Sequence, residues 1–378
     1  MYAAFGAASP FWPMFFASRG LSPAELGTLL ALGTLTRLLA GPLIGCFSDF
    51  VRAPRIILAI CTTVAVAAAL SFLPATGFVP LLLISIFQAA ALTPITAIAD
   101  ALATNATEKG GGPRSFEYGW IRGAGSAAFI AGTLVAGQVL SQNLVEPSAI
   151  IWLHAALLSC VVLAIPLVPT ISLPQTNNST PVADKSIAIG LRELLRNSVF
   201  RKVCIVAALI FGSHAMHDAF AVIRWNAAGV GPIAASILWS EAVVAEVVVF
   251  LFLGPLVIDR FGPRGAAALA AIAGVVRWTV MSETIEVTAL ALVQPLHGFT
   301  FAILHLACMR LIVASVPSQL ATTAQSFYAF ASAVSSGVLS FLSGILFGEL
   351  GATGFIAMAL ICGLAFPITL SLPRAQRR

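Results

Sequence analysis

The chain has 378 residues, of which 59% are hydrophobic and only 9% are charged, and its mean hydropathy is +0.98. A water-soluble domain is about one quarter charged, because polar side chains must cover its surface. With 20 Lys and Arg against 15 Asp and Glu, this chain has too few charges to do so. Lipid must therefore be the solvent for much of its surface, and we expect an all-α membrane protein in a lipid bilayer.

Cysteine usage and motif content argue against several other classes. The 6 cysteines sit singly in apolar runs, so neither a disulfide framework nor a zinc site is expected. No glycine-rich loop of the Walker type occurs, which argues against ATP as the energy source. The sequence also lacks the nucleophile–base constellation of an enzyme and the repeated polar rings of a channel. We therefore expect no cofactor, no metal and no catalysis.

Apolar runs between polar or Pro/Gly breaks predict about twelve spans, since each crossing of the hydrocarbon core needs roughly 20 residues. The first run carries Pro10 and Pro13 and no basic segment precedes it, so it reads as a span rather than a cleaved signal peptide. The predicted spans are residues 2–18, 24–48, 55–73, 78–104, 117–139, 149–169, 201–224, 232–258, 265–282, 286–313, 320–347 and 352–371.

A polar stretch and an internal repeat divide these spans into two halves. The longest polar stretch, residues 170–200, predicts a cytoplasmic linker between a six-helix bundle at 1–169 and another at 201–378. Residues 41–55 and 254–264 run out of the ends of the second and eighth spans, and both begin with Gly-Pro-Leu, continue to an Asp and end in Pro-Arg. Parallel repeats of this kind generate two bundles with the substrate path between them.

The basic residues predict an orientation. Of the 20 Lys and Arg, two (Arg19 and Arg224) lie in the odd loops, three (Arg37, Arg122 and Arg277) lie inside spans, and the rest lie in the even loops, linker and C-terminal tail. The positive-inside rule then places both termini in the cytoplasm, with the chain in the cytoplasmic (inner) membrane. The same asymmetry explains the pI of 9.1, so no nucleic acid is expected as a partner.

The loop after the second span resembles the conserved loop of the major facilitator superfamily, a Gly-x-x-x-Asp-Arg-x-Gly-Arg-Lys-like pattern. Gly45 fits its first position, but Ala53 replaces the usual second Gly. The resemblance implies a latch of charge-assisted hydrogen bonds between helix ends in one conformation. Its expected members are Asp49, Arg52, Arg55, Asp259 and Arg264. The alternative is a solvated turn whose arginines only set the topology.

Two further segments resemble lactose permease and the related phenylpropionate permease-like or nucleoside-symporter-like branch. Residues 116–126 are similar to the start of the fifth span of that branch, and residues 296–310 to its tenth span. Shorter likenesses occur at residues 244–247 and 276–278. The resemblance implies the major facilitator fold of two six-helix bundles, and secondary transport of a small solute by alternating access.

Charges within the first half are candidate substrate ligands, because an ionisable group in a membrane needs a partner or a function. Arg122 matches the sugar-binding arginine of lactose permease, and Asp100 matches its acidic partner less closely. Trp120 could stack on a ring, or serve only as packing. Arg37 has no acid within one turn and would suit a carboxylate substrate; the alternative is an ion pair with Asp218 or Glu241. For Asp100 and Arg122 the alternative is a structural ion pair.

The second half holds the titratable candidates for proton coupling. Glu246 is centred in the eighth span, Glu241 precedes it, and Arg277 of the ninth span is a possible counter-charge and substrate ligand. His297 matches the tenth-span histidine of lactose permease, and His305 lies eight residues further on. Buried Glu and His can be neutral in one state and charged in another. Both histidines could instead be satisfied polar residues that bridge helices.

One departure from lactose permease affects the coupling. Three residues after its tenth-span histidine that family carries a proton-binding glutamate, whereas this chain has Thr300. Glu246 or Asp100 would then have to carry the proton. In the seventh span, His214 and Asp218 are four residues apart and could hydrogen-bond. With His217 they lack a further ligand that would make a metal site.

These observations predict a monomeric proton symporter for a small organic solute, for which an aromatic acid, a nucleoside or a sugar would each suit some residues. The alternative is a proton-driven exporter of drugs or sugars with the same fold. Uptake driven by an inward proton gradient would distinguish the two.

Overall fold

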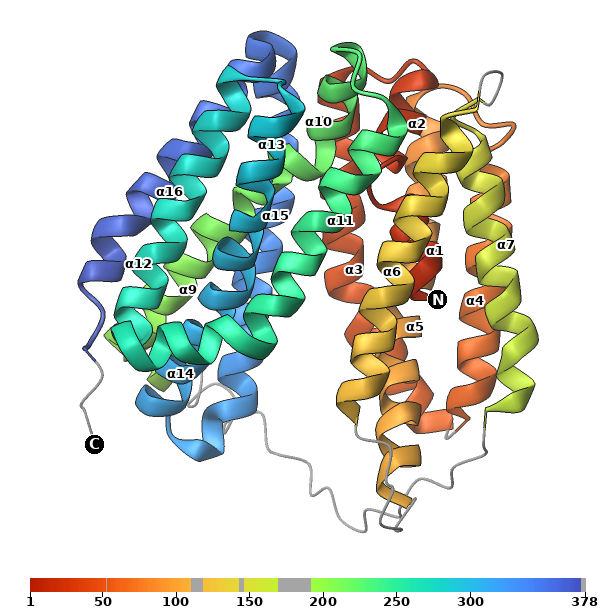
Figure 1. Ribbon diagram of the computed structural model, residues 1–378. Helices are drawn as coiled ribbons and strands as arrows, with labels where there is room; N and C mark the ends of the chain where they lie inside the picture. Colours follow the sequence, from red (N-terminus) through yellow and green to blue (C-terminus); the bar gives the residue numbers. More distant parts are fainter. Residues whose placement is uncertain (52, 110–117, 143–145, 169–191, 375–378) are drawn as a thin grey trace. The chain divides into compact units, whose positions relative to one another are not determined.

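A computed structural model describes residues 1–51, 53–109, 118–142, 146–168 and 192–374 (Figure 1). Every regular element in these ranges is a helix, and 9 stretches are long and apolar enough to cross a membrane. Two of these, Pro232–Glu283 and Ser318–Leu370, have 52 and 53 residues and are each long enough for two crossings. Together with the short helices of the first span, the described part of the chain fits the expected twelve crossings.

The chain divides into two compact units, which we describe separately. Unit 1 comprises Met1–Pro174 and Asp218–Ser240, and unit 2 comprises Gln175–His217 and Glu241–Arg378. Two helices therefore contribute to both units: α10 (His214–Ala227) and α11 (Pro232–Val248). The predicted bundles at 1–169 and 201–378 stay a prediction, as does the linker at 170–200, most of which lies outside the described residues.

Unit 1 contains, besides the parts of α10 and α11, the helices of the first half of the chain (Figure 1). They are α1 (Tyr2–Ala8), α2 (Trp12–Ser18), α3 (Pro23–Val51), α4 (Pro54–Ser71), α5 (Phe78–Lys109), α6 (Tyr118–Leu140), α7 (Ala149–Ala164) and the short 3₁₀ helix η1 (Ile165–Leu167). Helix α5 packs against α3 and α4, α4 also packs against α7, and α1 packs against α6.

The first span is two helices rather than the single predicted one, and proline is the physical reason. Pro10 has no N–H to donate to the Gly6 carbonyl four residues earlier, so the helix ends at Ala8. The Thr133 hydroxyl of α6 donates to that Gly6 carbonyl over 2.9 Å. A hydrogen bond from the neighbouring helix thus satisfies the acceptor that the proline leaves open.

Helices α1 and α6 touch through glycines. A Cβ added to Gly6 would overlap the Phe129 carbonyl of α6, and one added to Gly132 would overlap the Ala3 carbonyl of α1. Each helix therefore presents a glycine to the backbone of the other, which is how small residues allow helices to approach closely in membranes.

Unit 2 contains the helices of the second half of the chain (Figure 1). Besides the parts of α10 and α11, they are α9 (Ser198–Gly212), η2 (Val249–Leu253), α12 (Gly254–Glu283), α13 (Val287–Val293), η3 (Gln294–Leu296), η4 (Phe299–Ile303), α14 (Leu304–Ser315), η5 (Ser318–Leu320), α15 (Ala321–Leu350), η6 (Gly351–Thr353) and α16 (Gly354–Leu370). Helix α12 packs against α14 and α16, and α9 packs against α14, α15 and α16.

Two irregularities in unit 2 shape its polar interior. Gly262 has a φ of 68° within α12, a left-handed conformation that glycine adopts at low cost, and it turns the chain between the predicted eighth and ninth spans. The segments η2 and η4 are π-helical, and they lie next to each other in unit 2. Such π turns in longer helices occur frequently at functional sites.

Candidate functional site

A buried arginine organises the polar interior of unit 2. Arg277 of α12 has no exposed surface. Its Nη1 donates to His297 Nδ1 over 3.1 Å, and its Nη2 donates to Gln294 Oε1 over 2.8 Å. The guanidinium also lies 4.5 Å from the ring centre of Trp278, a cation–π distance. Burial of an arginine is costly unless its donors are satisfied, and His297 and Gln294 supply acceptors here.

His297 connects this arginine to a carboxylate. Its Nε2 lies 3.6 Å from Glu246 Oε2 of α11, so His297 contacts both Arg277 and the acid for which Arg277 was predicted as a possible counter-charge. The side chains of Glu246 and His297 keep 28% and 19% of their surface exposed. Because a carboxylate facing lipid would be strongly unfavourable, this exposed edge belongs to a face that water can reach.

Gln294 extends the network to a second histidine. Arg277 can only donate, so Gln294 Oε1 accepts from it, and the amide nitrogen is left to face His217 Nε2 at 3.3 Å. His217 Nε2 must then accept. His217 is buried, and Gln294 has no exposed surface, so this part of the network is closed to water.

A third histidine, His214, is hydrogen-bonded to Thr300, the residue that stands where lactose permease has its proton-binding glutamate. His214, the first residue of α10, places its Nε2 3.0 Å from the Thr300 hydroxyl and its Nδ1 3.1 Å from the Phe211 carbonyl. Its ring lies edge-on to that of His297, with 5.1 Å between the centres. The structure therefore brings a titratable group to Thr300 from another helix.

Close packing of two helices holds the acid and the histidine together. A Cβ added to Gly298 would lie 2.7 Å from Val249 Cγ2 and 2.8 Å from the Ala245 carbonyl oxygen. Gly298 follows His297 directly, and Ala245 precedes Glu246. The π segments η2 and η4 begin within three residues of Glu246 and within two of His297, respectively. The helix geometry therefore changes immediately beside the polar pair.

Aromatic rings adjoin the polar cluster. Phe301 stacks on His297 with 5.6 Å between ring centres and an interplanar angle of 12°. Phe211 and Phe250 lie 5.4 Å and 6.4 Å from Phe301. Since Phe301 retains 36% exposure, an aromatic surface continues from the exposed edge of His297.

The two other proton-coupling candidates lie apart from this hydrogen-bond network. His305 Nδ1 is 3.3 Å from the Tyr328 hydroxyl, and the His305 ring contacts those of Phe250 and Tyr328. Glu241 of α11 is half-buried, and within the described part of the chain it forms no hydrogen bond or ion pair. Their proposed roles in coupling stay predictions.

The substrate candidates of unit 1 are described unevenly. Arg37 of α3 is exposed and makes no hydrogen bond or ion pair among the described residues, so both its role as a substrate ligand and the alternative ion pair stay predictions. Asp100 lies half-buried in α5. Arg122 and Trp120 belong to α6, but their side chains lie outside the described residues, so the Asp100–Arg122 pair remains a prediction.

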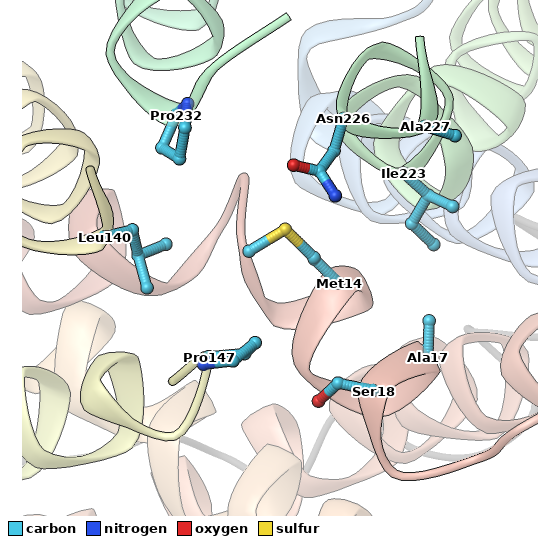
Figure 2. Close-up of a pocket in the computed structure, with 9 residues that line it drawn as sticks. All are labelled: Met14, Ala17, Ser18, Leu140, Pro147, Ile223, Asn226, Ala227 and Pro232. Atoms are coloured by element: carbon cyan, nitrogen blue, oxygen red, sulfur yellow. The ribbon is translucent and has the colours of Figure 1, made fainter. Parts of the chain in front are cut away.

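A cavity of about 390 Å³ opens among the ends of several helices in unit 1 (Figure 2). Met14 projects into the middle of the lining residues in this view, and Asn226 and Ser18 supply polar side chains. The lining consists of Met14, Ala17, Ser18, Leu140, Pro147, Ile223, Asn226, Ala227 and Pro232. None of these residues carries a charge.

The profile of the MFS_1 like family matches residues 1–358. The chain belongs to this family of major facilitator transporters. A probable 3-phenylpropionic acid transporter of Escherichia coli (strain K12) is 30% identical over 364 residues, which are 95% of this chain and 92% of that protein. The transporter is therefore a membrane protein rather than an enzyme, as the sequence predicts.

Solved structures confirm the major facilitator fold of this transporter. A mutant of the nucleoside transporter NupG has a TM-score of 0.81 at 17% identity and covers 98% of this chain and 95% of its own. A bacterial homolog of the human lysosomal transporter Spinster, solved in an inward-facing and unoccupied conformation, has a TM-score of 0.75 at 14% identity. It covers 98% of this chain and 93% of its own.

The loop residues of the transporter show contacts other than the expected latch. Arg55 donates through Nη2 to the carbonyls of Ile165 and Pro166, at 3.3 Å and 2.9 Å. It therefore caps the end of the sixth span. Asp259 is exposed, and neither it nor Arg264 forms a hydrogen bond or ion pair in the described chain. Arg52 and the Asp49 side chain lie outside the described residues, so the latch stays a prediction.

Sequence reasoning missed Gln294 and underrated His214. A signal for the first was present, because Gln294, His297 and Thr300 follow each other at intervals of three and so share one face of an apolar span. Within the described ranges, no group of three or more His, Cys, Asp or Glu is placed to hold a metal ion. His297, His217 and His214 instead bond to Arg277, Gln294 and Thr300, respectively.

Proposed function

We propose that this transporter carries a small organic acid with an aromatic ring into the cell together with protons. It would act as a monomer in the cytoplasmic membrane, with both termini in the cytoplasm, and alternate access by rocking of its two predicted bundles. The observation that carries the proposal is the series Glu246–His297–Arg277, with distances of 3.6 Å and 3.1 Å.

Charge balance explains why such a series would couple a proton to an anion. With Glu246 ionised and His297 neutral, the carboxylate offsets the charge of Arg277 through the intervening ring. Protonation of Glu246 leaves one net positive charge in a poorly solvated site, where electrostatic interactions are strong. A carboxylate substrate can then bind, and its departure favours release of the proton, because the two binding events are reciprocally linked.

Two observations support an aromatic acid as the solute. The 30% identical relative from Escherichia coli is described as a probable 3-phenylpropionic acid transporter. The exposed edge of His297 also continues onto the ring of Phe301, which would contact an apolar or aromatic part of the solute. Arg37 of unit 1 is proposed as a further ligand of the carboxylate, because an exposed guanidinium in an apolar span needs a function.

Uptake into proteoliposomes tests the proposal. Purified protein should accumulate labelled 3-phenylpropionate only when an inward proton gradient is imposed, and should prefer it to a nucleoside or a sugar. Glu246→Gln should abolish accumulation and keep exchange of internal for external solute, because exchange needs no net proton movement. Glu286→Gln is the matched control, since Glu286 is an exposed acid at the start of α13.

Three outcomes would contradict parts of this proposal. Accumulation by Glu246→Gln at the wild-type ratio would remove Glu246 from the coupling, and loss of accumulation in Glu241→Gln instead would assign it to Glu241. Extrusion of solute from vesicles against its gradient would favour the exporter alternative.

A further inference from the structure

We propose that His214 is a second proton-binding residue of the transporter, and that Thr300 allows it to gain and lose its proton without breaking a hydrogen bond. The inference rests on the proposed proton symport and adds a residue to that site. Its basis is the hydrogen bonding of the three histidines in the polar cluster of unit 2. Each has a different kind of partner, and the partner determines whether the ring can take up a second proton.

His297 and His217 are bound by groups that only donate at the relevant position. Arg277 Nη1 donates to His297 Nδ1, and the Gln294 amide nitrogen donates to His217 Nε2. An imidazolium needs protons on both ring nitrogens, so protonating either ring would set two donors against each other. Because these side chains are partly or fully buried, the lost hydrogen bond would not be replaced freely by water. Arg277 therefore disfavours a positive charge on both rings, directly at His297 and through Gln294 at His217.

His214 has partners that suit both protonation states. A carbonyl can only accept, so His214 Nδ1 must donate to the Phe211 carbonyl at 3.1 Å. The remaining nitrogen, Nε2, faces a hydroxyl, which can either donate or accept. When His214 is neutral, Thr300 donates to Nε2 over 3.0 Å. When it is protonated, Nε2 donates to the Thr300 oxygen instead.

The Thr300 hydroxyl has a second acceptor available for the protonated state. Its oxygen lies 3.2 Å from the His297 carbonyl and 3.4 Å from the Leu296 carbonyl. The hydroxyl proton can therefore turn from His214 to the backbone when His214 becomes charged. Thr300 has no exposed surface, so these protein groups, rather than water, must satisfy it. Protonation of His214 would thus change the hydrogen bonding of the backbone carbonyls beside the π segment η4.

The surroundings of His214 link its proton to the charge of the solute. Its ring is buried, edge-on to Trp278 at 5.4 Å and to His297 at 5.1 Å. Charged and titratable groups of the same cluster include Arg277 of α12, Glu246 of α11, His297 between η3 and η4, His217 of α10 and, through Ser213, Cys362 of α16, and Asp218 lies four residues after His214 on α10. A second positive charge near Arg277 is unfavourable unless an anion offsets it. A proton on His214 is therefore stabilised by ionised Glu246 or by a bound carboxylate.

Measurement of solute and proton uptake in the same proteoliposomes tests this inference. At equilibrium a pH difference of one unit drives about tenfold accumulation per coupled proton, because one pH unit corresponds to a tenfold change in proton activity. His214→Gln should still exchange labelled 3-phenylpropionate, but with only the Glu246 proton left its accumulation should fall about tenfold per pH unit and its solute-dependent proton uptake by about half. His154→Gln is the matched control, a buried histidine of unit 1 bonded to Gln88 and the Ala4 carbonyl, and should keep the wild-type ratio.

The results separate this inference from the proposed symport. Wild-type protein that takes up solute without protons would refute the symport itself. If the wild type is coupled, normal accumulation by His214→Gln would overturn the role of His214. The same role would be overturned if His217→Gln uncoupled transport and His214→Gln did not. If His214→Gln also loses exchange, Thr300→Val decides, because it removes the hydroxyl but keeps the shape. Retained exchange with the same reduced accumulation in Thr300→Val, together with wild-type accumulation in Thr300→Ser, supports the inference, whereas wild-type accumulation by Thr300→Val overturns it.

Discussion

Gly298 lies against the Ala245 carbonyl so closely that a methyl group added to it would be 2.8 Å from that oxygen. This contact holds together the helices that carry His297 and Glu246. We expect Gly298→Val to force the helices apart, destabilise the protein by about 1–3 kcal/mol and reduce accumulation of solute more than tenfold. Thermal unfolding in detergent and uptake into proteoliposomes measure the two effects.

Gly363→Ala provides the comparison for this variant. It lies in α16 of the same unit, and a Cβ there would meet Val275 Cγ2 at 3.9 Å, an ordinary contact. Its stability and uptake should match the wild type. Wild-type uptake by Gly298→Val would show that the close approach is not needed for coupling.

Gln294 should stabilise the cluster by satisfying Arg277 and His217 together. Gln294→Leu removes the oxygen that accepts from Arg277 and the amide nitrogen that donates to His217. Both groups are buried, so the free energy of unfolding should fall by about 1–3 kcal/mol. In a double-mutant cycle with His217→Leu, the combined loss should be smaller than the sum of the single losses, because both variants break the same hydrogen bond. Strict additivity would contradict the network.

Arg37 should select for negative charge on the solute. Arg37→Gln should raise the KM for 3-phenylpropionate at least tenfold, because a hydrogen bond to a charged group is worth about 1.5–3 kcal/mol. Competition by the uncharged amide of the same acid should be unchanged. Arg19→Gln is the control, since Arg19 lies 5.1 Å from the Phe15 ring at the end of α2. Equal losses for acid and amide would argue against a carboxylate ligand.

Thr133 should stabilise unit 1 because Pro10 leaves the Gly6 carbonyl without its helical partner. Thr133→Val should lower the free energy of unfolding by about 1 kcal/mol, the usual size of such a bond between membrane helices. In a Pro10→Ala background, the same substitution should cost less, because an alanine at that position would supply a backbone N–H. Denaturation of the four proteins in detergent provides the measurement, and an equal cost in both backgrounds would refute the explanation.

The fold could be predicted because every helix that crosses a bilayer must be largely apolar, and such helices can be recognised in the sequence. The resemblance of residues 116–126 and 296–310 then identified the family. The order of contacts within the site was less accessible. Arg277 was predicted as a possible counter-charge of Glu246, and the sequence did not reveal that His297 contacts both of them, since such contacts depend on the rotation of three helices about their axes. Hydropathy does not specify that rotation, and the π turns after Glu246 and His297 alter it further.

The break in the first span shows what local chemistry can and cannot reveal. Pro10 and Pro13 are visible in the sequence, and a helix end beside them is a direct consequence of the missing N–H groups. The hydrogen bond from Thr133 to the Gly6 carbonyl is not visible, because the two residues are 127 positions apart and meet only when α1 packs on α6.

Each π turn contains one residue more than the α-helical turn it replaces, so the helix after it is out of phase with the helix before it by about 100°. Deleting one residue from 249–253 or from 299–303 would turn the wide turn into an ordinary α-helical one and remove this offset. Chains of this family that differ by a single-residue gap at these places would therefore present different side chains to Glu246 and His297. A small insertion or deletion here would change specificity more than many substitutions elsewhere.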